Sequence, residues 1–103
     1  MGNFIKNYIL DGHKAVPCND ITSWAEAFES QDRIVAKTTK GLVEVSTVFL
    51  GIDHSFGGKL LLFETMIFGG KRNGEIHRYS TWEEAEKSHE EICKTFSTET
   101  EKV

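Results

Sequence analysis

Three polar side chains interrupt the most apolar part of this sequence, and their types are those that carry acid–base chemistry. Asp53 and His54 stand in the run GIDHSFGG, and Glu64 follows in the run LLLFETMIF. A neutral histidine near a carboxylate can act as a general base or bind a metal ion. One hypothesis is therefore a small hydrolase that uses Asp53, His54 and Glu64.

Each of these residues also has a purely structural interpretation. Neighbouring residues of an extended chain point to opposite sides, so Asp53 and His54 need not act as a pair. An Asx turn at Asp53, with a partly exposed His54, is the simpler expectation. Glu64 is costly to bury without a partner, which predicts an ion pair with Arg33 or Arg78.

A second candidate lies at Arg78 and Tyr79, just before a strongly signalled helix. The guanidinium group offers a planar fork for phosphate, a tyrosine can stack on a base, and a helix N-terminus adds partial positive charge. If these groups meet the glycine-rich loop, they form a small anion pocket. We therefore predict a ligand-binding set that comprises Asp53, His54, Glu64, Arg78 and Tyr79, and we assign no catalytic residue.

Neither the histidines nor the acidic residues show the spacing of a metal site. His13, His54, His77 and His89 form no HxH or HExxH pattern. A metal-dependent nuclease would need a lysine two residues after Glu64, where the sequence has Met66. We expect no metal ion and no cofactor.

Length, charge and cysteine content exclude several classes of protein. The chain has 103 residues, which predicts one domain, over residues 1–96, with a flexible tail at residues 97–103. Its formal net charge of −4 argues against direct nucleic-acid binding. No apolar run approaches the ~20 residues of a membrane span. The two distant cysteines and the absence of an apolar leader after Met1 predict free thiols and a cytoplasmic location.

Periodicity predicts an α+β domain. Strands are expected over residues 4–10, 13–17, 33–39, 42–50, 60–68 and 75–79, and helices over residues 20–30 and 82–96. Short turns between successive strands favour an antiparallel β-sheet of about four to six strands. The two amphipathic helices are expected to pack against this sheet.

The second helix and the longest strand carry further signals. Thr81 and Glu84 form a capping box, and His89 falls on the apolar stripe, where a hydrogen-bonded core histidine is the simplest expectation. The strand over residues 60–68 is apolar on both sides, so it is expected to be central and covered on both faces. The second face of this strand would be covered either by a helix or by another subunit, and on the second alternative we expect a homo-oligomer.

Three runs of the chain resemble a group of small proteins that recurs in phage and prophage genomes. The runs are VSTVFLGIDHSFGG, LLFETMIFGG and RYSTWEEAEKSH, and the segment SWAEAFESQDRIVAKT resembles the same group. The resemblance implies a phage-like origin, a setting in the cytoplasm of the host cell and an accessory or counter-defence role. The group has no established activity, so the resemblance assigns no catalytic residue.

The sequence is therefore compatible with three functions. The first is sequestration of a small phosphate-bearing, nucleotide-like ligand without turnover. The second is inhibition of a host or defence protein by the acidic face of the second helix, which includes Glu86 and Glu90. The third is the hydrolase described above. We take the first, a non-enzymatic function, as the working hypothesis.

Overall fold

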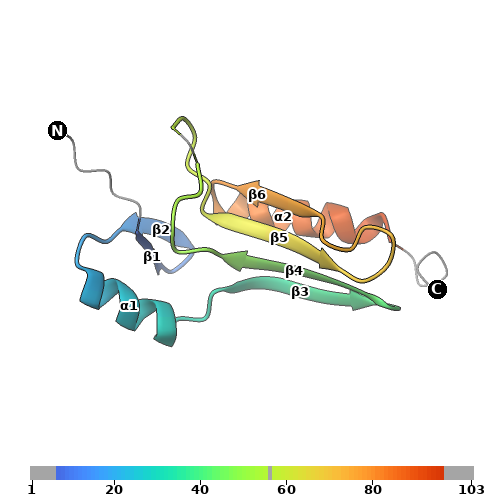
Figure 1. The fold of residues 1–103 in the computed structure, drawn as a ribbon, viewed down its shortest axis with the longest axis horizontal. Coiled ribbons are helices and arrows are strands. Elements are labelled where there is room, and N and C mark those ends of the chain that lie inside the picture. Colours follow the sequence, from blue (N-terminus) through green and yellow to red (C-terminus); the bar gives the residue numbers. More distant parts are fainter. Residues whose placement is uncertain (1–6, 56, 97–103) are drawn as a thin grey trace.

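The computed structural model describes residues 7–55 and 57–96, which form two helices and two antiparallel sheets. The elements follow in the order β1 (Tyr8–Asp11), β2 (Lys14–Pro17), α1 (Ile21–Ser30), β3 (Ile34–Lys40), β4 (Val43–Phe49), β5 (Phe63–Phe68), β6 (Ile76–Tyr79) and α2 (Trp82–Lys94) (Figure 1). This arrangement confirms the expected α+β class with an antiparallel sheet. The expected tail at residues 97–103 lies outside the described residues.

The larger sheet is a four-stranded meander in the order β3-β4-β5-β6. Strands that follow one another in sequence are neighbours in space, as the short turns predict. In β4 and β5 buried and half-buried residues alternate, which is the pattern of central strands with one fully covered face. At the end of β5, Gly69 has a φ of +87°, and a Cβ atom there would lie 2.2 Å from the Leu42 carbonyl oxygen. Only glycine can combine this backbone conformation with so close an approach to the Leu42 carbonyl group.

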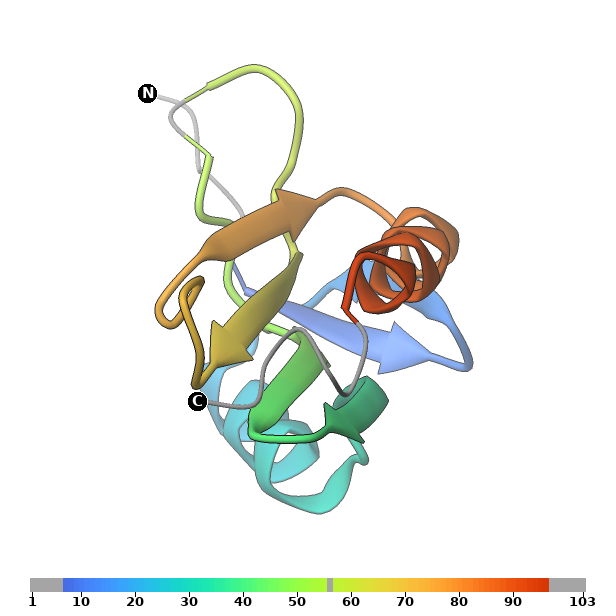
Figure 2. The ribbon, with the colours of Figure 1, turned by 90° about the vertical axis from the view of Figure 1, so that its right-hand side faces the viewer.

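Helix α2 lies along one face of this sheet (Figure 2). Its apolar residues join β4 and β5 in a core cluster formed by Val43, Val45, Ile67, Ile92, Cys93 and Phe96. The capping box is confirmed: the Glu84 N–H donates to the Thr81 hydroxyl at 3.1 Å, and the Glu84 carboxylate accepts from the Ser80 N–H. At the other end, Lys40 donates to the Cys93 carbonyl at 3.1 Å, which satisfies one of the last carbonyls of the helix.

The β1–β2 hairpin covers the remaining part of the same face. Tyr8 and Leu10 are buried with Phe49, Leu62 and Phe63 in a second core cluster. The hairpin is therefore a structural part of the domain, although its two strands form a separate sheet.

Helix α1 lies beside this hairpin, beyond the end of the four-stranded sheet (Figure 1). Two side chains hold it there: the Trp24 indole donates to the Gly51 carbonyl at 3.0 Å, and the Gln31 amide bonds to both backbone groups of Leu10. No residue of α1 is buried, although Trp24 and Phe28 stack on one another and the Arg33 guanidinium lies over the Phe28 ring. Only α2 therefore packs on the four-stranded sheet, whereas α1 packs on β1.

The second face of the four-stranded sheet carries no cover among the described residues. We call it the open face, and the strand register assigns to it Ile34, Lys37, Thr39, Glu44, Ser46, Val48, Glu64, Met66, Phe68, Ile76 and Arg78. Strand β5 is central, as expected. The expected second cover is not one of the two helices.

Strand β5 begins at Phe63, three residues later than the sequence suggests. The apolar residues before it belong to a wide connection from β4, in which the Asp53 carboxylate accepts a hydrogen bond from the Leu61 N–H. A hydrogen bond between the Leu50 N–H and the Leu62 carbonyl closes the base of this connection. A hydrogen bond from the Asp53 side chain thus replaces part of the backbone strand pairing that the apolar sequence of this segment predicts.

Candidate functional site

Asp53 organises the connection between β4 and β5. Its Oδ1 atom accepts from the backbone N–H groups of Ser55 and Leu61, both at 2.9 Å, and Oδ2 accepts from the Ser55 hydroxyl at 2.7 Å. The bond to the residue two positions ahead is an Asx turn, as the structural interpretation predicts. The carboxylate therefore acts first as a clamp on its own loop.

His54 takes part in the same loop through its backbone. Its N–H donates to the Leu61 carbonyl at 3.0 Å, while the residue itself is exposed. The following glycines Gly57 and Gly58 have positive φ angles and open space around them. These contacts are those of a loop that is held at its base, which explains why the sequence concentrates glycine here.

Glu64 pairs with Arg78, as one of the two sequence alternatives predicts. The Arg78 Nε atom donates to the carboxylate at 3.0 Å, across the pairing of β5 with β6. The pair lies on the open face, and the Glu64 side chain is only 14% exposed. Arg33 instead donates to the carbonyls of Phe28 and Phe49.

Tyr79 lies on the opposite face of the sheet from Arg78. Its hydroxyl donates to Thr65 at 3.1 Å and is 2.7 Å from the Ser88 hydroxyl under α2. A recess of about 240 Å³ still brings parts of both residues together with Lys59. However, Lys59 is paired with Glu84 at 3.2 Å and Arg78 with Glu64, so an anion would have to displace a carboxylate from either cation. The ligand-binding assignment of the five residues stays a prediction.

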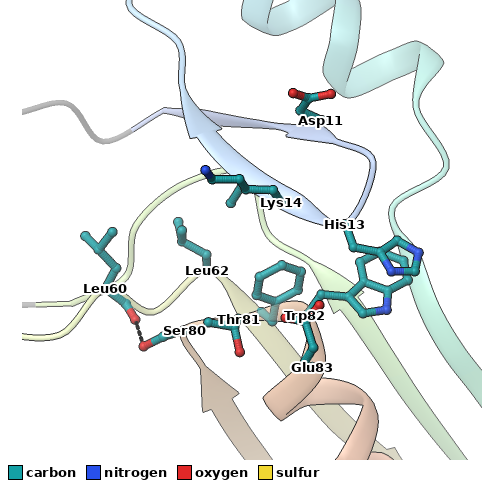
Figure 3. Close-up of a pocket in the computed structure, with 11 residues that line it drawn as sticks. Asp11, His13, Lys14, Leu60, Leu62, Ser80, Thr81, Trp82 and Glu83 are labelled. Atoms are coloured by element: carbon teal, nitrogen blue, oxygen red, sulfur yellow. Dashed lines mark hydrogen bonds between the residues drawn. The ribbon is translucent and has the colours of Figure 1, made fainter.

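A larger cleft lies between the tip of the β1–β2 hairpin and the start of α2 (Figure 3). Its volume is about 560 Å³, within the usual range for small-molecule sites. We call it the hairpin–helix cleft, and it is lined by Asp11, His13, Lys14, Ala15, Leu60, Leu62, Phe63, Ser80, Thr81, Trp82 and Glu83. None of the five predicted ligand-binding residues lines it.

Stacked aromatic rings fix one wall of the hairpin–helix cleft. The His13 and Trp82 rings are 3.8 Å apart at their centroids and nearly parallel, with an angle of 5° between their planes. Phe63 meets Trp82 edge to face at 6.3 Å. The Trp82 Nε1 atom is buried and has no hydrogen-bond partner among the described residues. The stack joins two elements that are distant in sequence, so it also anchors the hairpin tip to the helix.

Polar groups surround an apolar floor in this cleft. Leu62 and Phe63 are buried beneath it, and the Lys14 side chain extends from the hairpin toward Leu62, whereas the Asp11 carboxylate points away from the floor (Figure 3). The first turn of α2 lies at the rim, where the exposed N–H groups of a helix carry partial positive charge. The Glu83 carboxylate lies in the same first turn, so the cleft suits a ligand with an apolar body and a single anionic group close to the Lys14 ammonium.

The sequence carries only indirect signals for the cleft. Asp11-Gly12 indicates a turn, and Trp82 stands at the first position of a helix, but neither pattern shows that the two meet. The contact depends on how the hairpin docks on α2, which is a tertiary event. Sequence reasoning therefore missed His13, Lys14 and Trp82.

A buried chain of polar side chains joins α2 to the sheet beneath it. His89, which is 3% exposed, bonds to Thr47 through Nδ1 at 2.7 Å and to Thr38 through Nε2 at 2.9 Å. Thr47 in turn bonds to Thr65, which accepts from Tyr79. His89 is thus the hydrogen-bonded core histidine that the sequence predicts. Burial lowers its pKa below the ordinary value, and the nearby Glu90 carboxylate opposes this effect in part.

Two further questions about the described part of the chain are whether it groups metal-ligating side chains and whether it holds a helix of membrane-spanning length. Within residues 7–55 and 57–96, no three His, Cys, Asp or Glu side chains are grouped so that they could hold a metal ion. No helix in this part of the chain is long and apolar enough to cross a membrane. Cys18 and Cys93 are both free thiols.

Comparison with known family models, with curated proteins and with solved structures finds no match to this chain.

Proposed function

We propose that this protein binds and sequesters a small, phosphate-bearing, nucleotide-like ligand in the hairpin–helix cleft, without turnover. The observation that carries the proposal is the cleft itself: about 560 Å³, with an apolar floor and a polar rim. Small-molecule sites share this design, in which apolar area supplies affinity and a few polar groups orient the ligand. The cleft is the larger of the two recesses described above.

The chemistry of the lining favours a flat ligand with an anionic end. A base or a similar ring would lie on Leu60 and Leu62, beside the Trp82 ring. The phosphate would lie near the ammonium group of Lys14 and the first turn of α2, where both the cation and the helix dipole favour negative charge. Glu83 belongs to this first turn and would repel any anionic group placed there, so the phosphate would lie nearer Lys14, and a monophosphate is favoured over a polyphosphate.

The cleft is a better position for the ligand than the site around Arg78. Both cations near that site, Lys59 and Arg78, already have carboxylate partners. No ion pair is recorded for Lys14 among the described residues, and the side chain is exposed. Binding at the cleft therefore costs no existing ion pair.

As part of the same proposal, we infer a phage accessory role, as the resemblance described for the sequence implies. A protein that sequesters a nucleotide signal in the host cytoplasm would act against a defence that depends on that signal. A dimer of this chain would bind two ligand molecules, one in each hairpin–helix cleft. The acidic helix face remains the alternative, because the glutamates of α2 are exposed, and that function would appear as a salt-sensitive complex with a basic protein.

Thermal denaturation with a panel of ligands tests the proposal. The panel holds adenosine, adenosine monophosphate, a cyclic dinucleotide and ADP-ribose. A ligand at ~100 times its dissociation constant stabilises by about 2.7 kcal/mol, which raises the melting temperature by on the order of 10 °C. We expect a shift with a phosphate-bearing compound, a smaller shift with adenosine, and recovery of unchanged ligand after denaturation.

Lys14→Ala and Lys71→Ala form a matched pair for this experiment. Both lysines are exposed, but only Lys14 lines the cleft. The ligand-dependent shift should fall in Lys14→Ala and persist in Lys71→Ala. Equal shifts in the two variants would contradict the proposed site, and conversion of the ligand would contradict sequestration without turnover.

A further inference from the structure

The open face of the four-stranded sheet is more apolar than a solvent-facing sheet surface requires. Ile34, Phe68 and Ile76 expose 50%, 44% and 42% of their surface, and the half-buried Val48 and Met66 lie between them. A typical antiparallel sheet with one wet face places polar residues at such positions. These side chains would gain from removal from water.

The strand register makes these side chains one continuous patch. Val48 on β4 pairs with Ile34 on β3, and Met66 on β5 pairs with Ile76 on β6. Phe68 pairs with Glu44 at the end of β4. Between β4 and β5, however, Val48 pairs with Glu64 and Met66 pairs with Ser46, so Val48 and Met66 meet only as diagonal neighbours, about 7–8 Å apart.

The charged groups of the open face are already neutralised within the chain. Glu64 pairs with Arg78 at 3.0 Å, and Lys37 pairs with Glu44 at 3.7 Å. The register places these two pairs at diagonally opposite corners of the patch. The open face therefore carries an apolar band that runs diagonally past the central Ser46, and it has no net charge. A strongly acidic or strongly basic partner would find no counter-charge there, whereas a second open face would meet no net repulsion.

The rest of the molecule is less suited to self-association. The exposed surface of α2 carries five glutamates against two lysines, namely Glu83, Glu84, Glu86, Glu90 and Glu91 with Lys87 and Lys94. Two copies that met through α2 would place like charges together. Charge thus favours the open face over the helix as the surface on which a second copy sits.

We propose that two copies of this chain associate through the open faces of their four-stranded sheets. Four strands about 4.8 Å apart and about six residues long form a flat face of about 400 Å². Two such faces would bury about 800 Å² in total, which is below the ~1,200 Å² of a stable specific interface and is the size of a weak or transient one. The dimer is therefore weak, with a dissociation constant in the micromolar range.

This association is independent of ligand binding. The hairpin–helix cleft lies on the side of the sheet that carries α2, as its lining by Phe63 and Trp82 requires. The open face is the reverse side. Each copy in the dimer therefore keeps its cleft open to solvent, and the two proposals fail separately.

Sedimentation equilibrium of the full chain between about 5 and 500 µM tests the proposal. The mass should rise with concentration from 11.6 kDa toward twice that value. Phe68→Lys should remain monomeric throughout, while Ile21→Lys, which changes an even more exposed apolar residue on α1, should behave as the wild type. A wild-type chain that stays monomeric, or a Phe68→Lys chain that dimerises equally well, would overturn the proposal.

A cross-linking experiment provides a second readout if Phe68→Lys fails to fold by circular dichroism. Ser46 lies near the centre of the open face, and Glu26 is exposed on α1. In a Cys18→Ser background, Ser46→Cys should form an intermolecular disulfide on mild oxidation, and Glu26→Cys should not. Equal cross-linking at both positions would contradict a specific interface. Retained nucleotide binding in Phe68→Lys would separate loss of the dimer from loss of the fold.

Discussion

The imidazole of His89 on α2 lies 2.7 Å from the hydroxyl of Thr47 at the centre of β4, in a position where both residues are buried. Since Tyr79 donates to Thr65, the chain of bonds is complete if Thr65 donates to Thr47 and Thr47 donates to Nδ1. This pattern assigns a neutral imidazole with its proton on Nε2, which donates to Thr38. A second proton would reverse the bond to Thr47.

His89 should make the stability of the fold depend on pH. Burial lowers its pKa in the folded state below the ordinary value of 6.5. As pH falls below about 6.5, His89 binds a proton in the unfolded chain but not in the folded chain. The free energy of unfolding therefore falls, by at most about 1.4 kcal/mol per pH unit. Urea denaturation at pH 8, 7, 6 and 5.5 measures this slope.

The matched control for this prediction is His54, whose side chain is exposed. His54→Gln should keep the slope between pH 7 and 5.5, whereas His89→Gln should lose it and be less stable at pH 8. Carboxylates contribute only at lower pH, because Arg72 and His77 lower the pKa of Glu75 to about 2, and Lys59 lowers that of Glu84. A slope that survives in His89→Gln would refute this assignment.

Asp53→Ala should loosen the connection between β4 and β5. The change removes three hydrogen bonds with described residues, two of which come from backbone N–H groups. We expect a loss of about 2 kcal/mol and faster hydrogen exchange at the Leu61 amide, with α2 amides unaffected. Asp53→Asn keeps the Oδ1 acceptor and should lose less. An unchanged hydrogen-exchange rate at the Leu61 amide in Asp53→Ala would show that the Asp53 hydrogen bonds do not stabilise the loop.

Arg78→Ala should weaken the sheet without weakening ligand binding. Removal of the guanidinium leaves the largely buried Glu64 carboxylate unpaired, so we expect a loss of about 1 kcal/mol. Glu64→Gln in the same background should recover part of it, which a double-mutant cycle in urea measures. Affinity for the nucleotide should change less than twofold, because Arg78 does not line the hairpin–helix cleft. A tenfold loss of affinity would instead favour the site predicted from the sequence.

Thr81→Ala should destabilise the start of α2. Its hydroxyl accepts from the Glu84 N–H, one of the helix donors with no partner inside the helix. Loss of such a cap costs about 1 kcal/mol, and Thr81→Ser should be close to neutral because the hydroxyl remains. Thermal denaturation compares the two variants, and equal melting temperatures would contradict the role of the cap.

Local patterns were enough to predict much of the fold. The Thr81–Glu84 capping box, the alternation in β4 and the position of His89 depend on residues close in sequence or on one helix face, so periodicity captures them. Strand alternation also predicts that the side chains of Arg78 and Tyr79 point to opposite faces of the sheet, which the structure confirms. The Glu64 partner had two candidates, because pairing depends on strand order.

The remainder required contacts that no local pattern encodes. The His13–Trp82 stack depends on docking of the hairpin on α2, and the late start of β5 depends on the reach of Asp53 to Leu61. Helix α1 has an apolar stripe that would suit the sheet as well as the hairpin. Hydrogen bonds between Gln31, the C-cap residue of α1, and the backbone of Leu10 hold the helix against the hairpin instead.

Titration of the isotope-labelled chain with adenosine monophosphate, followed by amide chemical shifts, tests the proposed binding site most directly. Binding at the hairpin–helix cleft should move the amides of Gly12 to Lys14, Leu60 to Phe63 and Ser80 to Glu83, in a saturable and concerted way. Amides of the open face, such as Ser46 and Met66, should stay in place at constant protein concentration. Shifts confined to the Asp53–His54 loop or to Arg78, or no saturable shifts at all, would contradict binding in the cleft.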